Sequence, residues 1–111
     1  MLNGLLKKNF GKKTIKYITK FLSLSINDKK EIKTYLSGFY PTTSKRFTAA
    51  LKKHILNLKE NPYMYSVYPE NQNYRRMVVD NYIVLYKIVE EEKKVEIIRI
   101  LRASWDLPKY L

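Results

Sequence analysis

The regular pattern of hydrophobic residues begins with a strand-like stretch and continues with a helix-like one. Residues 15–25 are rich in β-branched and aromatic side chains, which predicts a first strand. Asp28 and Glu31 are three residues apart, the spacing of a capping box that satisfies two amide groups where a helix begins. Apolar residues follow at helical spacing until Gly38 and Pro41, so we predict a short helix of about three turns.

A second helix has the clearest pattern in the chain. The apolar residues that recur along one of its faces are Phe47, Leu51, Ile55 and Leu58. Thr42 or Thr43 would cap this helix, and Asn61-Pro62 would end it. The cations on its other faces are Lys45, Arg46, Lys52, Lys53 and Lys59. His54 lies beside the apolar stripe, and we expect a partly buried structural histidine there rather than a general base.

The C-terminal half has the pattern of an antiparallel meander. Strand-like runs cover residues 74–80, 82–89 and 95–101. Asp80-Asn81 fits a tight hairpin turn, because both residue types tolerate a positive φ, and residues 91–94 fit a longer one. The preceding loop, residues 62–73, carries three tyrosines that we expect to lie on the sheet edge: Tyr63, Tyr65 and Tyr68. The middle strand is apolar on both faces, so both faces of the sheet must be at least partly covered, one of them by the helices.

These elements predict an α+β fold in one domain. Two N-terminal helices would pack on a twisted antiparallel sheet, in the order strand, helix, helix and three strands, followed by a short C-terminal tail. The chain has 111 residues, too few for two separate cores. Residues 1–13 carry little pattern, so we expect a mobile N-terminal arm followed by a single domain at 14–111.

Charge is concentrated in the first half of the sequence. The formal net charge is +12, and residues 1–60 hold 13 lysines and one arginine against three acids, which gives +11. Because 45% of the residues are hydrophobic, the chain is not a disordered polycation. A one-sided field of this kind favours an acidic partner, either nucleic acid or an acidic protein. The alternative is a lysine-rich surface that serves only solubility, as in proteins encoded by AT-rich genomes.

Residue composition excludes several kinds of site. Without cysteine and with His54 as the only histidine, the chain offers no disulfide, thiolate nucleophile or metal cluster. It has no phosphate-binding glycine motif, and we expect no cofactor and no metal. Apolar runs reach only four or five residues, far short of the ~20 that span a bilayer, and the N-terminus does not resemble a signal peptide. We therefore expect a soluble cytoplasmic protein without a membrane partner, in which the acidic run 90–92 is a solvated turn.

Cationic side chains within the predicted sheet are the remaining candidates for a site. They are Arg75, Arg76, Arg99 and Arg102. An arginine in an apolar strand needs a polar partner or an open face. Strand alternation would allow Arg75 and Arg99 to meet on the open face, where two guanidinium groups suit phosphate or carboxylate. The alternative is that each arginine pairs with a nearby acid, for instance Arg76 with Glu96.

The meander carries a family resemblance. Residues 74–88, YRRMVVDNYIVLYKI, followed by an acidic turn and VEIIRIL at 95–101, resemble the C-terminal half of RelE/ParE-type toxins of bacterial type II toxin–antitoxin modules. The resemblance covers roughly residues 16–111. It implies growth inhibition and plasmid stabilisation, through either ribosome-dependent mRNA cleavage or poisoning of DNA gyrase. It also implies a small acidic cognate antitoxin as partner.

The ribonuclease branch of that family is matched only in part. That branch usually has an arginine after the tyrosine that opens the middle strand, where this chain has Ile83, and a basic residue or histidine after the last strand, where it has Ala103-Ser104-Trp105. Arg75 and Tyr110 supply the other two groups. We therefore favour a non-catalytic, ParE-like gyrase poison; the alternatives are a RelE-like mRNA endonuclease, a basic nucleic-acid-binding domain without toxicity, or an inactive relative.

The candidate surfaces follow from these hypotheses. The target-binding candidates are Arg75, Arg76, Arg99, Arg102 and Tyr110. The electrostatic surface would be formed by Lys45, Lys52, Lys53 and Lys59. An antitoxin would lay an acidic amphipathic helix or an extended strand along the open sheet face or the groove of the second helix. On the sheet face, its footprint would be three residues that we expect to be exposed: Ile83, Leu85 and Leu101.

Overall fold

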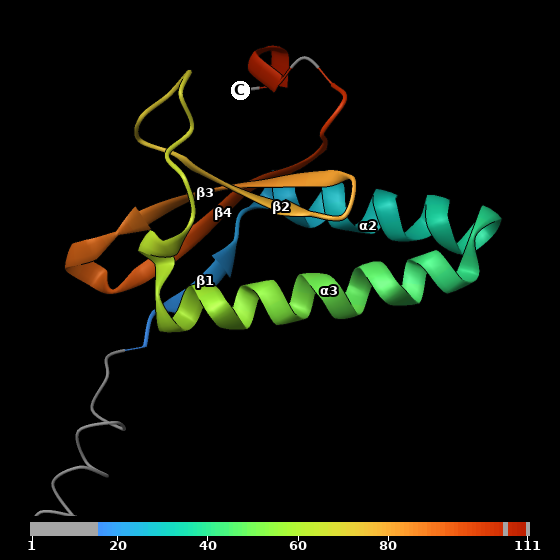
Figure 1. Cartoon of the computed structure of the whole chain (residues 1–111), viewed down its shortest axis with the longest axis horizontal. Coiled ribbons are helices and arrows are strands. Elements are labelled where there is room, and N and C mark those ends of the chain that lie inside the picture. Colours follow the sequence, from blue (N-terminus) through green and yellow to red (C-terminus); the bar gives the residue numbers. More distant parts are fainter. Residues whose placement is uncertain (1–15, 106, 111) are drawn as a thin grey trace, which may run out of the picture.

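The structure is a computed structural model that describes residues 16–105 and 107–110 (Figure 1). Its helices are α2 (Ser23–Phe39) and α3 (Pro41–Glu60), and its strands are β1 (Ile18–Phe21), β2 (Arg75–Val79), β3 (Tyr82–Val89) and β4 (Lys94–Arg102). Short 3₁₀ turns lie at Pro62–Met64, Glu90–Glu92 and Leu107–Tyr110. The α+β class and the order of elements are confirmed. The predicted arm at 1–13 lies outside the described residues.

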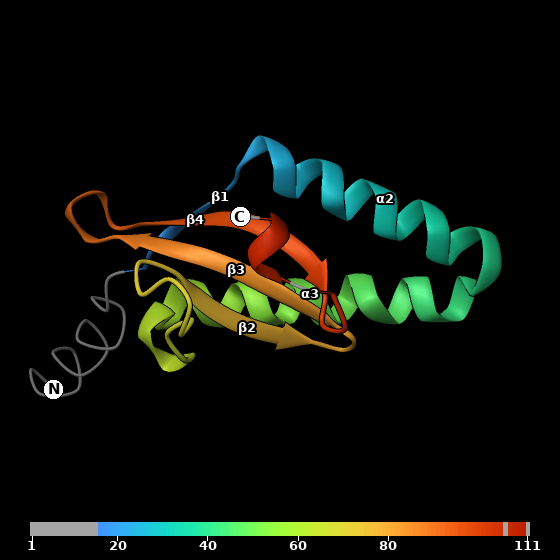
Figure 2. The same cartoon turned by 90° about the horizontal axis from the view of Figure 1, so that it is seen from above.

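The four strands form one open sheet in the order β1-β4-β3-β2. β2, β3 and β4 pair antiparallel, as predicted, whereas β1 pairs with β4 in parallel. Asp80 has a φ of 54° in the two-residue turn between β2 and β3, the left-handed conformation expected of that turn. Figure 2 shows α3 lying across one face of the sheet and α2 running beside β4. The α2–α3 turn extends beyond the sheet in both views.

The first strand is shorter and α2 longer than the sequence predicts. β1 ends at Phe21, and α2 already begins at Ser23. The buried Ser25 hydroxyl donates to the Leu22 carbonyl at 2.7 Å, a local bond that favours the turn from strand into helix. The predicted capping role of Asp28 is therefore wrong, since this residue lies inside α2 and is buried.

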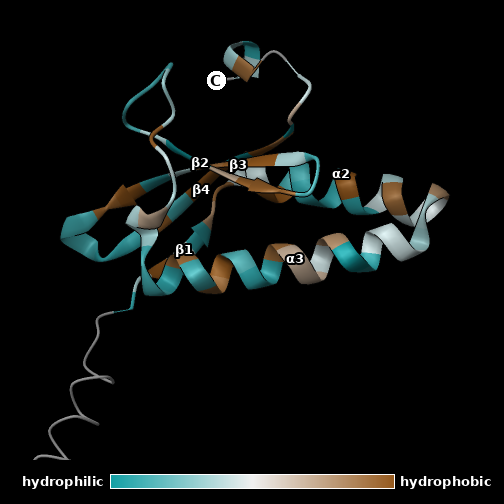
Figure 3. Ribbon diagram, in the orientation of Figure 1, coloured by the Kyte–Doolittle hydropathy of each residue, from teal (hydrophilic) through white to brown (hydrophobic). Residues whose placement is uncertain are grey.

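The second helix matches its prediction except at its start. Pro41 occupies the first turn of α3 and Tyr40 the N-cap position, with no side-chain cap hydrogen bond. Proline suits this position because its missing N–H would have no helical partner there. The expected caps Thr42 and Thr43 are thus part of the helix. The stripe on α3 is buried as predicted, and Figure 3 shows hydrophobic and hydrophilic residues alternating along the helix.

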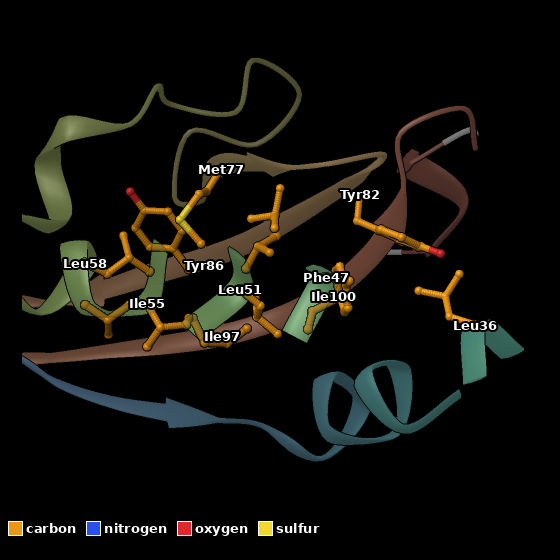
Figure 4. Packing of buried hydrophobic residues seen from close by; sticks show 13 residues of the cluster. Leu36, Phe47, Leu51, Ile55, Leu58, Met77, Tyr82, Tyr86, Ile97 and Ile100 are labelled. Carbon is orange, nitrogen blue, oxygen red and sulfur yellow. The ribbon is translucent and has the colours of Figure 1, made fainter. Parts of the chain in front are cut away.

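The main core fills the space between α3 and the sheet. Figure 4 shows the α3 stripe facing Tyr86 and Ile97. Tyr82, Val84 and Tyr86 of β3 all belong to this cluster, so the tyrosine-bearing face of β3 packs on the helices. The buried Tyr86 hydroxyl donates to the Pro62 carbonyl at 2.6 Å, which joins the sheet to the end of α3.

The opposite face of the sheet is also covered. Ile83, Leu85 and Leu101 are at most 3% exposed and pack with Tyr68 and Leu107. The expectation that these three residues form an exposed antitoxin footprint is therefore wrong. Their cover comes from the loop before β2, whose backbone pairs along the β2 edge, and from the last 3₁₀ turn. Alternation along a strand fixes which residues share a face, but it does not show what lies over that face.

Candidate functional site

A pocket of about 340 Å³ lies between α2, the end of β4 and the C-terminal 3₁₀ turn. Its lining includes Arg99, Arg102 and Tyr110, three of the five predicted target-binding residues. Tyr35, Tyr82 and Trp105 add aromatic surface, and Asp28 and Glu31 add carboxylates. The structure thus brings together the end of the last strand and the C-terminal tail, and it adds the first helix as a third wall.

Asp28 is the central polar group of the wall that α2 contributes. Its carboxylate accepts hydrogen bonds from Nε and Nη2 of Arg99, both at 2.8 Å, and from the backbone N–H of Ile100 at 2.9 Å. β1 pairs with β4 only as far as Ile97, so Asp28 supplies the acceptor that the β4 edge lacks beyond that point. Hydrogen bonding to Asp28 raises the pKa of Arg99.

The C-terminal tail closes the pocket through aromatic contacts. The rings of Trp105 and Tyr110 stack with centroids 5.0 Å apart and an interplanar angle of 22°. Arg99 Nη1 donates to the Tyr110 carbonyl at 2.9 Å, and its guanidinium carbon lies 5.9 Å from the Tyr110 ring centroid. Arg99 therefore connects α2 to the tail, and its hydrogen-bonding groups are largely engaged within the protein. Burial raises the pKa of Tyr82 on the pocket wall.

The pocket is close to electrically neutral. Among its described lining residues, two arginines face two carboxylates, and one of each forms the Asp28–Arg99 ion pair. His54 does not line it; its Nδ1 lies 2.7 Å from the Ala50 carbonyl oxygen and its ring 6.4 Å from that of Tyr65. The partly buried position predicted for His54 is confirmed, and its structural role stays a prediction.

Arg75 and Arg76 lie away from this pocket. β3 separates β2 from β4, with Arg75 opposite Tyr86 and Arg99 opposite Leu85, and these two β3 residues are on opposite faces. The prediction that Arg75 and Arg99 meet is therefore wrong. Arg75 Nη1 instead donates to the Tyr65 carbonyl at 2.6 Å, which holds the tyrosine loop.

Arg76 lies at the outer edge of the sheet. It lines a shallow hollow between β2 and the loop that precedes it, together with Val67 and Val78, which are exposed. The predicted alternative, in which each arginine pairs with an acid, holds for Arg99 but with Asp28 as the acid. Glu96, the acid predicted for Arg76, forms an ion pair with Lys94 at 3.2 Å.

Glu90 forms a polar junction that the sequence pattern does not predict. Its Oε1 accepts hydrogen bonds from the hydroxyls of Tyr17, at 2.8 Å, and Tyr63, at 2.6 Å, and Oε2 accepts one from Lys93. The Lys93 hydrogen bond and then those of the tyrosines lower the pKa of Glu90 to about 2. This same bonding raises the pKa of both tyrosines. The expected solvated turn is thus also a structural junction of three chain segments.

A groove of about 300 Å³ separates α2 from α3 on their outer side. Its apolar lining includes Phe47, Leu51 and Ile55, together with Phe21 and the exposed Leu56. The lysines around it are Lys29, Lys33, Lys52 and Lys59, and no acidic residue is among its described lining. Lys52 and Lys59 of the predicted electrostatic surface therefore border an apolar groove, whereas Lys45 and Lys53 are exposed outside it.

Two further properties concern the described residues as a whole. No three acidic or histidine side chains within 16–105 and 107–110 come together as a metal site requires. Neither helix in these ranges has the length and hydropathy that spanning a bilayer demands.

Comparison with solved structures shows what this fold resembles. The chromosomal ParDE toxin–antitoxin system from P. aeruginosa is similar with a TM-score of 0.64 and 14% identity, over 78% of this chain and 95% of that one. The toxin–antitoxin complex RelBE2 from Mycobacterium tuberculosis is similar with a TM-score of 0.59 and 18% identity, over 79% of this chain and 99% of that one. At these identities the likeness shows the fold.

Sequence comparison identifies the family. No curated protein matches the sequence. A family model, described as the ParE toxin of the type II toxin–antitoxin system parDE, matches residues 20–107. The matched segment includes both helices, all three strands of the meander and the pocket residues as far as Trp105, whereas Tyr110 lies beyond it. The chain belongs to the ParE toxin family of type II toxin–antitoxin systems.

Proposed function

We propose that this toxin acts by binding its target rather than by cleaving RNA, and that the target is DNA gyrase. One observation supports this above all: the pocket that gathers Arg99, Arg102 and Tyr110 is neutral, and its central arginine is held by Asp28. An arginine committed to an internal carboxylate is a poor partner for the charge that develops on a phosphorane.

RNA cleavage makes further demands on the pocket. Removing the proton of a 2′-hydroxyl needs a base, and protonating the leaving oxygen needs an acid, each with a pKa near the working pH. Burial moves the pKa of Tyr82 upward, away from that range, and His54 lies outside the pocket. The mRNA endonuclease remains the second candidate. Arg102 and Tyr110 are exposed, and the Tyr110 ring stacks on Trp105, which gives an aromatic surface on which a nucleobase can stack.

The two mechanisms give different products in purified systems. With gyrase and supercoiled plasmid, the toxin is expected to accumulate linear DNA after protein denaturation. Arg102→Ala should reduce that accumulation more than Lys87→Ala, a control at an exposed residue of β3. With programmed ribosomes, no cut in the mRNA is expected. Ribosome-dependent cleavage without gyrase-dependent linear DNA would overturn the proposal in favour of the endonuclease.

For the antitoxin, the groove between α2 and α3 is the proposed docking site. Its apolar floor and four bordering lysines complement a helix with apolar residues along one side and acids flanking them. This assignment replaces the sheet-face footprint, because Ile83, Leu85 and Leu101 are buried.

Charge reversal tests this docking site. Lys52→Glu, which lies on the groove, should weaken antitoxin binding about tenfold, or about 1.4 kcal/mol. Lys53→Glu is the matched control, since the neighbouring residue on the same helix is exposed but does not line the groove. Calorimetric titration of each purified variant measures the difference. Equal effects of the two reversals would show a diffuse electrostatic attraction instead of a groove.

A further inference from the structure

The hairpin of α2 and α3 ends in an exposed aromatic tip. Tyr35, Phe39 and Tyr40 are 46%, 69% and 54% exposed. Their rings contact each other, with centroids 5.1 to 6.4 Å apart and tilts of 44° to 57°. Large apolar side chains gathered at one exposed point commonly mark an interaction site. Figures 1 and 2 show that this turn extends beyond the sheet, so a partner can reach it from several directions.

The tip is held in place by its own helices. The hydroxyls of Ser37 and Ser44 are 3.0 Å apart and hydrogen-bond across the turn. Pro41 fixes the start of α3 directly after Tyr40. The aromatic cluster is therefore presented on a short, constrained turn rather than on a long loop, which reduces the entropy lost when a partner binds.

Positive charge around the tip is not compensated by nearby acids in the sequence. Residues 32–59 contain no aspartate or glutamate and six cations: Lys33, Lys45, Arg46, Lys52, Lys53 and Lys59. On a helix that rises about 1.5 Å per residue, Arg46 lies about 9 Å along the α3 axis from Tyr40, and Glu60 about 30 Å away. On α2, Glu31 lies about 12 Å from Phe39. This end of the molecule therefore combines exposed rings with an excess of cations.

We propose that the tip of the α2–α3 hairpin binds duplex DNA, with Phe39 and Tyr40 inserted among the bases and Lys33, Lys45 and Arg46 placed against phosphates. Two packed helices are too broad to enter a groove about 12 Å wide side by side. The narrow turn can enter it, and the last turns of α2 and the first turns of α3 then lie over the two backbones. Apolar wedges flanked by cations are a known way to bind and deform a duplex.

Duplex DNA fits this surface better than the other common partners. A platform for single-stranded nucleic acid offers successive bases separate stacking faces, whereas these three rings are tilted against one another. An apolar pocket on a protein would accept the rings but would gain nothing from cations on both helices. The proposal does not depend on gyrase being the target, since it concerns direct contact with DNA.

Salt dependence tests the contribution of the cations. The purified full-length toxin is titrated into a fluorescent 20-base-pair duplex at several salt concentrations. Three phosphate contacts predict a slope of log affinity on log salt of about −2.7. The double variant Lys45→Ala/Arg46→Ala should reduce the slope by about 1.8, and the control Lys87→Ala/Lys109→Ala should leave it unchanged. No duplex binding at low salt, an unaltered slope in the first variant, or equal affinity for single strands would overturn the proposal.

DNA unwinding tests the wedge. A closed circular plasmid relaxed by a topoisomerase in the presence of the toxin should show a shifted topoisomer distribution, because inserted side chains unwind the duplex. Phe39→Ser/Tyr40→Ser should abolish the shift and keep the salt slope, and Leu56→Ser, another exposed apolar residue on α3, should retain the shift. A shift that persists in the tip variant would refute insertion. Loss of growth inhibition with unchanged DNA binding would assign the tip to a protein partner instead.

Discussion

Replacing Asp28 with alanine should destabilise the protein far more than a substitution at an exposed helical position would. The side chain of Asp28 is 8% exposed and that of Arg99 is 15% exposed, so water cannot readily replace the bonds between them. The substitution removes the acceptor of three hydrogen bonds, two from a guanidinium and one from the Ile100 amide. Alanine at this position therefore leaves a partly buried charge and a buried N–H without an acceptor.

The size of the effect follows from similar perturbations. Breaking a buried ion pair by removing one partner costs about 3–5 kcal/mol. Because Arg99 lies at a pocket wall, we expect a cost at the lower end of this range, about 3 kcal/mol. With an unfolding entropy of about 2.1 cal/mol/K per residue, this cost lowers the Tm of a chain of this length by about 13 °C. Asp28→Ala should also expose the end of β4, which hydrogen exchange at Ile100 would report as faster exchange.

A double-mutant cycle separates the ion pair from general damage. Urea unfolding of Asp28→Ala, Arg99→Met and the double variant should give a coupling energy above about 1.5 kcal/mol, because contacting residues in one network are not additive. Glu31→Ala is the control, since this exposed acid lies on the same pocket and surface substitutions usually stay within about 0.5 kcal/mol. A cost below about 1 kcal/mol for Asp28→Ala, or simple additivity, would refute the reasoning.

Four other substitutions, one of them a control, test the structure elsewhere. Tyr86→Phe leaves the Pro62 carbonyl without its donor and should cost about 1–2 kcal/mol in urea unfolding; no change would mean that water replaces the hydroxyl. Leu58→Ala, at a fully buried site, should cost about 2–5 kcal/mol, whereas the exposed Leu56→Ala should cost less than about 0.5 kcal/mol. The pKa of Glu90 falls from 4.5 to about 2 on folding, so the contribution of its carboxylate to folding stability is present above pH 4.5 and disappears as the pH drops towards 2. Between pH 5 and 3, the Glu90→Gln variant should therefore lose less folding stability than the wild type. Equal losses would contradict a stabilising role of the Glu90 carboxylate.

The parts of the fold that depend on short-range pattern were predictable. The α3 stripe repeats with helical period, and the pairing of β2 with β3 follows from a two-residue turn whose first residue, Asp80, adopts a positive φ. Each of these features involves residues close in sequence, where local chemistry decides the outcome. The meander also holds the residues that first resembled the toxin family, so local pattern carried the family assignment as well.

Asp28 shows where local pattern misleads. Its spacing from Glu31 is equally compatible with a helix cap and with a position inside a helix. The deciding fact is the parallel pairing of β1 with β4, which stops at Ile97 and leaves the Ile100 amide needing an acceptor. That requirement joins residues about seventy positions apart, and no sequence window contains both.

For the same reason, only part of the candidate site could be predicted from the sequence. Arg102 and Tyr110 are close to Arg99 in the chain, so their gathering follows from one strand and the turn after it. Arg75 is on another strand, and its place depended on sheet register and on what covers each face. Tyr68 and Leu107 were the available signals, since large apolar side chains in the loop before β2 and in the C-terminal tail need a surface to cover.

The placement of charge explains why the long-range attraction of acidic partners should centre on the helices rather than on the pocket. Carboxylates oppose the cations of the pocket and of the Glu90 junction, so these sites contribute little long-range field. The hairpin retains its charge because residues 32–59 contain no acid. Lys33 belongs both to the proposed antitoxin groove and to the proposed DNA contact. An acidic antitoxin helix in the groove would therefore weaken the field that attracts DNA, and by linkage DNA would weaken antitoxin binding by the same factor.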